Sequence, residues 1–203
     1  MVASVFLCCK PNEPRMALEL FTRWRSEWRQ RRQAVAYVGA LRAEPSADDV
    51  EWLAAEGTHG DSDRARWELR YARAALGLLA AERDALDDMT PSLVAREIAA
   101  AMHADPRVAA QMVKLAEQQF NERLSAYRHA MTDRTATSGV TERLGDMFLR
   151  LADAPPPNAE TRARAFALVA RYLDEANVAL REHFGAAVLP PDVKPSVLAQ
   201  TKG

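Results

Sequence analysis

The sequence predicts an all-α fold, a single helical-bundle domain of about six or seven helices around a central buried helix. Apolar residues recur every three or four positions along most of the chain, which is the spacing that lines one face of a helix. A β-branched alternating run, typical of a strand, is found only at residues 2–7. Between Tyr71 and Ala81 a single charged side chain, Arg73, interrupts apolar or small residues. We therefore expect the helix over residues 63–88 to be covered by other helices on most sides.

The composition fits one domain with a sizeable core. Of the 203 residues, 48% are hydrophobic and 27% are charged, as in ordinary globular proteins. The net charge of −1 argues against a protein-wide field that would attract nucleic acid or anionic lipid. The charge is unevenly spread, because residues 1–42 hold eight basic and three acidic residues, a net charge of +5, which leaves −6 for the remainder.

The two cysteines, Cys8 and Cys9, are adjacent, so they indicate no disulfide framework and favour a reducing compartment. The apolar opening at residues 1–9 has neither the basic start nor the cleavage site of a secretory signal. The apolar run over residues 71–81 is too short to span a bilayer. We expect a cytoplasmic protein without a membrane span.

The first helix is expected over residues 14–42, with Pro14 in the first turn, where no N–H is needed. Ser46 then has the residue type of an N-cap, and two aspartates follow it. This pattern predicts a short second helix that runs to Glu56 and stops at Gly57. The apolar residues of the first helix recur at helical spacing: Leu18, Phe21, Trp24, Trp28, Val35, Val38 and Leu41.

The central helix is expected to begin after a polar loop, with Asp61 or Asp63 as its N-cap. We expect it to run to Asp87 and Asp88, whose charges oppose the helix dipole at that end. Gly77 in its middle costs ~1 kcal/mol relative to Ala unless a neighbour approaches closely there.

Two further helices are expected to start at polar residues followed by proline. Thr90 before Pro91 marks the first, and Asp105 before Pro106 marks a long helix that runs to Met131. The expected buried stripe of the long helix is Val108, Met112, Leu115 or Ala116, Phe120, Leu124, Tyr127 and Met131.

The last two helices are expected over residues 140–153 and from Asn158, as N-cap, to Phe184. Residues 186–203 contain three prolines and predict an extended tail. The chain therefore divides into an N-terminal segment at 1–13, a helical domain at 14–185 and the tail.

Sequence motifs for catalysis or for a cofactor are lacking. The chain has no Cys-x-x-Cys pair, no glycine-rich phosphate loop and no nucleophile elbow. It also lacks the two Glu-x-x-His motifs that a di-iron bundle uses. We therefore expect no cofactor and no metal. A haem ligand at His103 or His183 is the alternative, because haem needs only one histidine.

One polar cluster, at residues 59–70, combines the residue types of an active site with those of an ion-pair network. Arg64 lies one turn before Glu68, so we expect Glu68 to lie between guanidinium groups. Structural networks also perturb pKa values, and we favour a structural role over a catalytic one. The candidate catalytic residues are His59, Asp61, Asp63, Glu68 and Arg70.

The stretch over residues 23–32 combines two tryptophans with five arginines. Trp24 and Trp28 are one helical turn apart, and three arginines follow one another on an adjacent side. Trp and Arg are enriched at protein interfaces, although the same residue types bind nucleic acid or an anionic lipid surface. The predicted interface residues are Trp24, Arg25, Trp28, Arg29 and Arg32.

These patterns predict a non-enzymatic adaptor or regulatory protein that acts through protein–protein contacts. We expect a protein partner, and self-association through the face that carries Trp24 and Trp28. One alternative is a small all-α enzyme, or a haem or metal binder, that uses residues 59–70. A second alternative, which the net charge disfavours, is a nucleic-acid binder that uses residues 23–32.

Overall fold

The computed structural model describes residues 13–85, 87–133, 135 and 137–185, with side chains from Trp24 onward. Over this part of the chain the structure has seven α-helices, one short 3-10 helix and no strand, which confirms the all-α prediction. None of the described helices is both long enough and apolar enough to cross a membrane. The predicted N-terminal segment, up to residue 12, and the predicted tail lie outside the described residues.

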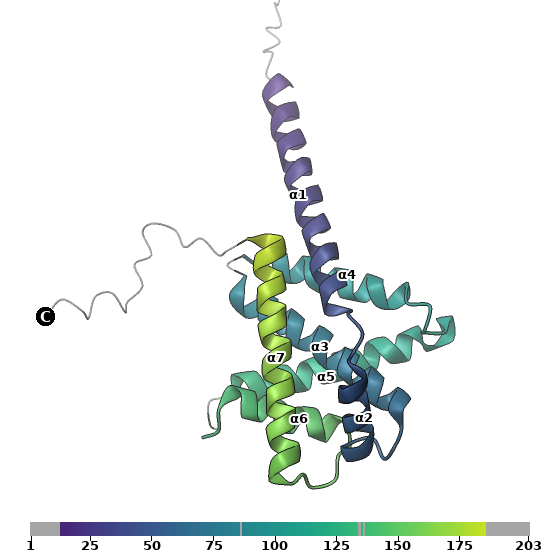
Figure 1. Cartoon of the computed structure of the whole chain (residues 1–203). Coiled ribbons are helices and arrows are strands. Elements are labelled where there is room, and N and C mark those ends of the chain that lie inside the picture. Colours follow the sequence, from purple (N-terminus) through teal and green to yellow (C-terminus); the bar gives the residue numbers. More distant parts are fainter. Residues whose placement is uncertain (1–12, 86, 134, 136, 186–203) are drawn as a thin grey trace, which may run out of the picture.

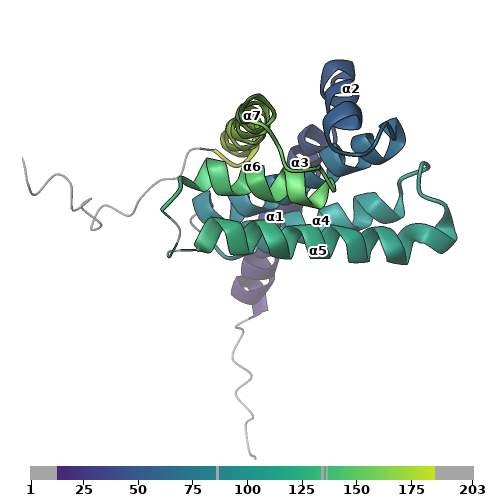
Figure 2. The ribbon, with the colours of Figure 1, turned by 90° about the horizontal axis from the view of Figure 1, so that it is seen from below.

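The helices pack around α3, which contacts α1, α2, α4, α5 and α7, and twelve of its 23 residues are buried (Figure 1). Figure 2 shows α5 and α6 side by side, and α6 also packs on α7. The prediction of a central buried helix is confirmed. The elements are α1 (Glu13–Leu41), α2 (Ala47–Glu56), α3 (Ser62–Asp84), α4 (Met89–His103), η1 (Ala110–Met112), α5 (Val113–Thr132), α6 (Val140–Leu151) and α7 (Ala159–Phe184).

Three helices begin at the caps that the sequence predicts, because each cap side chain satisfies backbone N–H groups of the first turn. The Ser46 hydroxyl accepts a hydrogen bond from the N–H of Asp49 at 3.1 Å. The Asp61 carboxylate accepts from the N–H groups of Asp63 and Arg64 at 3.0 and 2.9 Å. At the start of α7, the Asn158 side chain accepts from the N–H of Thr161 at 2.8 Å.

Gly77 is a point of close contact between α1 and α3. A Cβ atom at this position would lie 2.4 Å from Cδ1 of Leu41, a distance that real side chains do not reach. The hydroxyl of Tyr37, one turn earlier on α1, donates a 2.8 Å hydrogen bond to the carbonyl oxygen of Gly77. The conformational cost of a mid-helix glycine is therefore offset by packing.

The end of α3 differs from the prediction. The helix ends at Asp84, and Asp87 lies in the connection to α4. The Asp87 carboxylate accepts hydrogen bonds from the N–H groups of Met89 and Thr90 at 2.9 and 2.6 Å. The predicted acidic C-terminus at 87–88 is thus wrong, because Asp87 caps the following helix, where a negative charge is favourable. The prediction of Thr90 as that cap is wrong for the same reason.

The connection between α4 and α5 also differs from the prediction. Asp105 does not start a helix, because its carboxylate binds the guanidinium groups of Arg42 and Arg107. The chain passes through a turn and η1 before α5 begins at Val113. Met112, which was predicted to be buried, is consequently 46% exposed, whereas of the alternatives Leu115 and Ala116 it is Ala116 that is buried.

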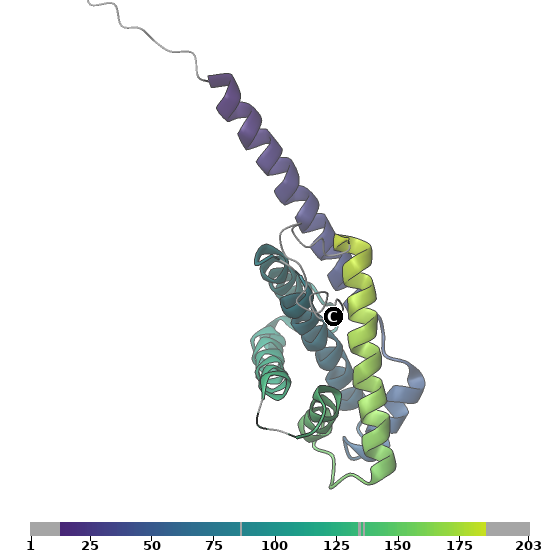
Figure 3. The same cartoon turned by 90° about the vertical axis from the view of Figure 1, so that its left-hand side faces the viewer.

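Helix α1 divides into an arm, residues 13–33, and a root, residues 34–41. Figure 3 shows the arm extending beyond the other helices. Among the described side chains of α1, the buried ones all belong to the root: Ala34, Tyr37, Val38 and Leu41. Val35 lies between them in sequence but is 52% exposed.

Candidate functional site

An exposed apolar stripe on α1 is formed by Trp24, Trp28 and Val35, which are 59%, 54% and 52% exposed. Spacings of four and seven residues place them within about 40° of one another around the helix axis. The four buried residues of the root centre on a direction about 110° away. Helix α1 therefore has two apolar faces, and the body covers one of them.

A basic row borders this exposed stripe. The guanidinium carbon of Arg32 lies 4.9 Å from the ring centroid of Trp28, in cation–π contact. Between this part of α1 and the C-terminal end of α7 is an open groove of about 650 Å³, whose α7 side carries Glu182 and His183. The groove is lined by all five predicted interface residues, so the structure brings Trp24, Arg25, Trp28, Arg29 and Arg32 together on one surface.

The predicted catalytic cluster at residues 59–70 is divided among several locations. His59 and Arg64 both contact Asp153: Nε2 of His59 lies 3.8 Å and Nη2 of Arg64 lies 3.6 Å from its Oδ2 atom. Asp61 is occupied as the cap of α3, and Asp63 pairs with Arg66 at 2.8 Å on the surface. These side chains do not converge on a common point, which removes the geometric basis for a shared active site.

Glu68 belongs to a separate, buried ion pair. Its carboxylate accepts a 2.7 Å hydrogen bond from Nε of Arg123 on α5, and Nη2 of Arg123 binds the second oxygen. The same guanidinium lies 5.0 Å from the ring centroid of Tyr71. The expectation that Arg64 flanks Glu68 is wrong. The partner comes from another helix, which spacing along α3 could not show.

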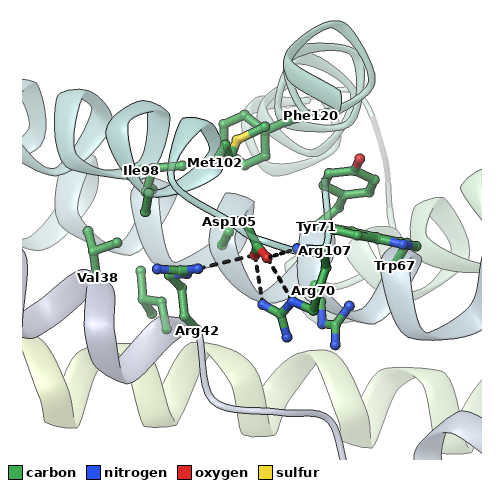
Figure 4. A pocket seen from close by; sticks show the side chains of 13 residues that line it. Val38, Arg42, Trp67, Arg70, Tyr71, Ile98, Met102, Asp105, Arg107 and Phe120 are labelled. Atoms are coloured by element: carbon green, nitrogen blue, oxygen red, sulfur yellow. Dashed lines mark hydrogen bonds and ion pairs between the residues drawn. The ribbon is translucent and has the colours of Figure 1, made fainter. Parts of the chain in front are cut away.

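Arg70 belongs to a third group, a charged cluster formed by Arg42, Glu44, Arg70, Asp105 and Arg107. Figure 4 shows its members except Glu44. Glu44 accepts a 2.6 Å hydrogen bond from Arg70 and also binds Arg107. Asp105 accepts from Arg107 at 2.8 and 2.7 Å and from Arg42 at 3.1 Å. The Arg107 guanidinium, together with that of Arg42, holds the pKa of the Asp105 carboxyl well below its usual range.

An apolar cavity of about 60 Å³ lies against this cluster. Its walls come from α1, α3, α4 and α5, and Figure 4 shows Ile98, Met102 and Phe120 on one side, with Trp67 and Tyr71 on α3. Arg42, Arg70, Asp105 and Arg107 also line it. Sequence reasoning missed Glu44, Asp105 and Arg107, since the first precedes a proline and the others resembled a helix start.

The histidines do not form a metal centre in the part of the chain that the structure describes, where no group of three potential ligands lies together. His103 binds Glu117 at 2.7 Å, and His183 lines the groove beside α1. Neither position gathers the further ligands that a structural zinc site needs.

Comparison with known proteins finds no counterpart: no family model, curated protein or solved structure matches this chain. The geometry of the two surfaces described above therefore carries the functional argument. One is the exposed stripe with its basic row on α1, and the other is the cavity with its charged cluster in the body.

Proposed function

We propose that this protein works by protein–protein contact through α1, and that its partner is a second copy of the same chain. The observation that carries the proposal is the second apolar face of α1, formed by Trp24, Trp28 and Val35. A rigid helix that keeps two tryptophans more than half exposed has the amphipathic form that fits a helix into a groove on another protein.

The residue types of this surface favour a protein partner. Tryptophan and arginine are the side chains most enriched among the residues that dominate binding energy at interfaces. Trp28 and Arg32 are already stacked at 4.9 Å, so little rotational freedom remains to be lost when a partner covers them.

The charge distribution favours a second copy as that partner. Residues 1–42 carry a net charge of +5 and the remaining residues −6, so the arm of one molecule is attracted to the body of another. Two arms in parallel contact would instead bring the rows of Arg25, Arg29 and Arg32 together, which is repulsive. A reciprocal pair, in which each arm lies on the body of the other copy, closes as a dimer.

The test is the mass of the protein in solution, measured by light scattering across a dilution series. The full chain should form a dimer that dissociates on dilution. Trp28→Ala removes two tryptophans from a reciprocal dimer and should weaken it about 1,000-fold, corresponding to the ~2 kcal/mol typical of each central interface aromatic. The matched control is Val140→Ala, which shortens another exposed apolar residue far from the arm and should leave the dimer unchanged.

A second variant separates a protein interface from a nucleic-acid interface. Replacing Arg25, Arg29 and Arg32 together by Gln should slow association and reduce its salt dependence, with a smaller loss of affinity than Trp28→Ala causes. A wild-type protein that stays monomeric at high concentration contradicts the proposal. So does a monomer that binds single-stranded DNA with an affinity that the triple variant abolishes, because phosphate contacts depend on those charges.

A further inference from the structure

The cavity in the body takes no part in the contact proposed for α1. We propose that this cavity is a binding site for a small carboxylate with a short apolar tail, the tail lying inside and the carboxylate among Arg42, Arg70 and Arg107. Four features support this site: the residues of the cavity walls, the charge of the adjoining cluster, a buried hydrogen-bond donor without a partner, and an open hollow that gives access to the cavity.

The walls select an apolar group. Trp67 and Tyr71 form one side, with ring centroids 5.7 Å apart, and Phe120 lies across from them (Figure 4). The space of about 60 Å³ has room for roughly three carbon atoms of a tail. Along the apolar part of the wall water finds few hydrogen-bond partners, which favours an apolar group there.

The charged cluster selects an anion. It contains three guanidinium groups, from Arg42, Arg70 and Arg107, and two carboxylates, from Glu44 and Asp105, which leaves one positive charge in excess. These ion pairs also join the turn after α4 to the segment that follows α1, and equal numbers of positive and negative charges would be enough for that structural role. A bound carboxylate would neutralise the excess charge.

Arg70 supplies a specific donor. Its Nη2 atom binds Glu44 at 2.6 Å, while its Nε atom is buried and has no hydrogen-bond partner. A buried donor without a partner is unfavourable by about 1–3 kcal/mol, and most native proteins avoid it. An anionic oxygen that accepts a hydrogen bond from this atom would remove the penalty. The guanidinium carbon is held 5.0 Å from the ring centroid of Trp67, which fixes its position beside the cavity.

An open hollow of about 550 Å³ adjoins the cavity and shares Trp67, Tyr71 and Arg107 with it. Arg64 and Arg123 line this hollow as well, so its basic side chains outnumber its single acidic one, Glu68. A carboxylate is attracted to such a surface and reaches the cavity past Arg107, whereas an amine of the same length is repelled.

Butanoate, whose three-carbon tail matches the cavity volume, is the probe, and the indole N–H resonance of Trp67 is the signal, assigned by its loss in Trp67→Phe. We expect butanoate to shift this resonance in a saturable manner, with a dissociation constant of about 1 mM or below. Butylamine tests the role of the charge, and acetate tests the role of the tail. Both should bind at least ten-fold more weakly.

Three variants locate the site. Ala101→Leu places a larger side chain in the cavity wall and should abolish the shift, while the amide spectrum shows that the fold is kept. Arg70→Met removes the guanidinium but keeps the side-chain stem, and it should weaken butanoate binding at least ten-fold. The matched control is Arg66→Met, one turn earlier on α3 and paired with Asp63, which should bind butanoate like the wild type.

The outcomes that overturn the proposal are equally concrete. They are the absence of any butanoate shift at Trp67, equal binding of butylamine, and an unchanged affinity for butanoate in Ala101→Leu. If Arg70→Met fails to fold, Ala101→Leu still tests whether the cavity is the binding site, because it leaves the charged cluster intact.

Discussion

Two Arg–Trp pairs have nearly the same local geometry in different surroundings. On α1, Arg32 lies 4.9 Å from the ring centroid of Trp28, and on α3, Arg70 lies 5.0 Å from that of Trp67. Trp28 is more than half exposed, whereas Trp67 packs against the core. Arg70 also binds Glu44, which lies 26 residues away in the sequence.

A spacing of three or four residues along a helix is enough to place an arginine over a tryptophan ring. What the pair then contacts depends on the rest of the fold. A cation over an aromatic ring on an exposed helix is free to meet a partner. The same pair in the body, fixed by a distant carboxylate, becomes part of a wall and of an ion-pair network. The arm and the body should therefore respond very differently to loss of charge or of volume, and the following changes are ordered by expected size.

The largest effect is expected from Glu68→Ala in the body. The substitution leaves the half-buried Arg123 guanidinium without its carboxylate, which lowers the free energy of unfolding by ~3 kcal/mol, the low end of the range for a buried pair. Urea denaturation followed by circular dichroism measures the loss. The control is Asp63→Ala, which breaks an exposed pair and should change stability by less than ~1 kcal/mol. Equal losses of unfolding free energy in the two variants would contradict the expected difference between the ion pair in the body and the exposed one.

A smaller loss is expected from Gly77→Ala, which tests the junction of the root with the body. The added methyl group collides with Leu41, so stability should fall by ~1–3 kcal/mol despite the better helix propensity of Ala. Combining it with Leu41→Ala should give less than the sum of the two single effects, because the collision then disappears. An increase in stability for Gly77→Ala alone would show that the root is not held tightly against α3.

The charged cluster should appear in the acid dependence of stability. Arg107 lowers the folded-state pKa of Asp105 below the unfolded value of about 3.9. Its contribution is therefore fully present above about pH 4 and is lost as the pH falls towards the folded-state pKa. Unfolding free energies measured between about pH 5 and about pH 2 should fall less steeply for Asp105→Asn than for the wild type. Parallel curves would contradict the assignment.

The smallest effect is expected from Arg32→Gln on the arm. Loss of an exposed cation–π contact should change the stability of the isolated chain by no more than ~1 kcal/mol. Arg70→Gln should cost more, since it also releases Glu44. Both variants must be measured at a dilution where association is negligible, because a dimer adds its own stability. A larger loss for Arg32→Gln than for Arg70→Gln would reverse the comparison between arm and body.

Much of the fold follows from short-range patterns in the sequence. Ser46, Asp61 and Asn158 act as N-caps as predicted, because capping depends on residues two or three positions apart. The failures lie at Asp87 and Asp105, where an acidic side chain has two possible uses. Asp87 caps the helix after it rather than ending the one before it, and Asp105 binds Arg42 from 63 residues away.

The two candidate surfaces could be predicted to different degrees, again because short-range patterns are visible in the sequence and long-range contacts are not. Trp24 and Trp28 lie on one face of one helix, so their neighbourhood follows from a spacing of four. The cluster at the cavity joins Arg42 and Glu44 to Arg70 and Asp105, from three separate stretches of chain. No single helical pattern contains that information, because it depends on how α1, α3 and α4 meet.

The arm has a mechanical consequence, because one stiff rod carries both surfaces. Its root supplies Val38 and Leu41 to the cavity wall, while its far end extends roughly 30 Å beyond the root at 1.5 Å per residue. A rod held at one end is a lever: a tilt of about 10° at the root moves the far end by roughly 5 Å. A change of packing around the cavity that tilted the root by this amount would displace the tip by about the length of one helical turn.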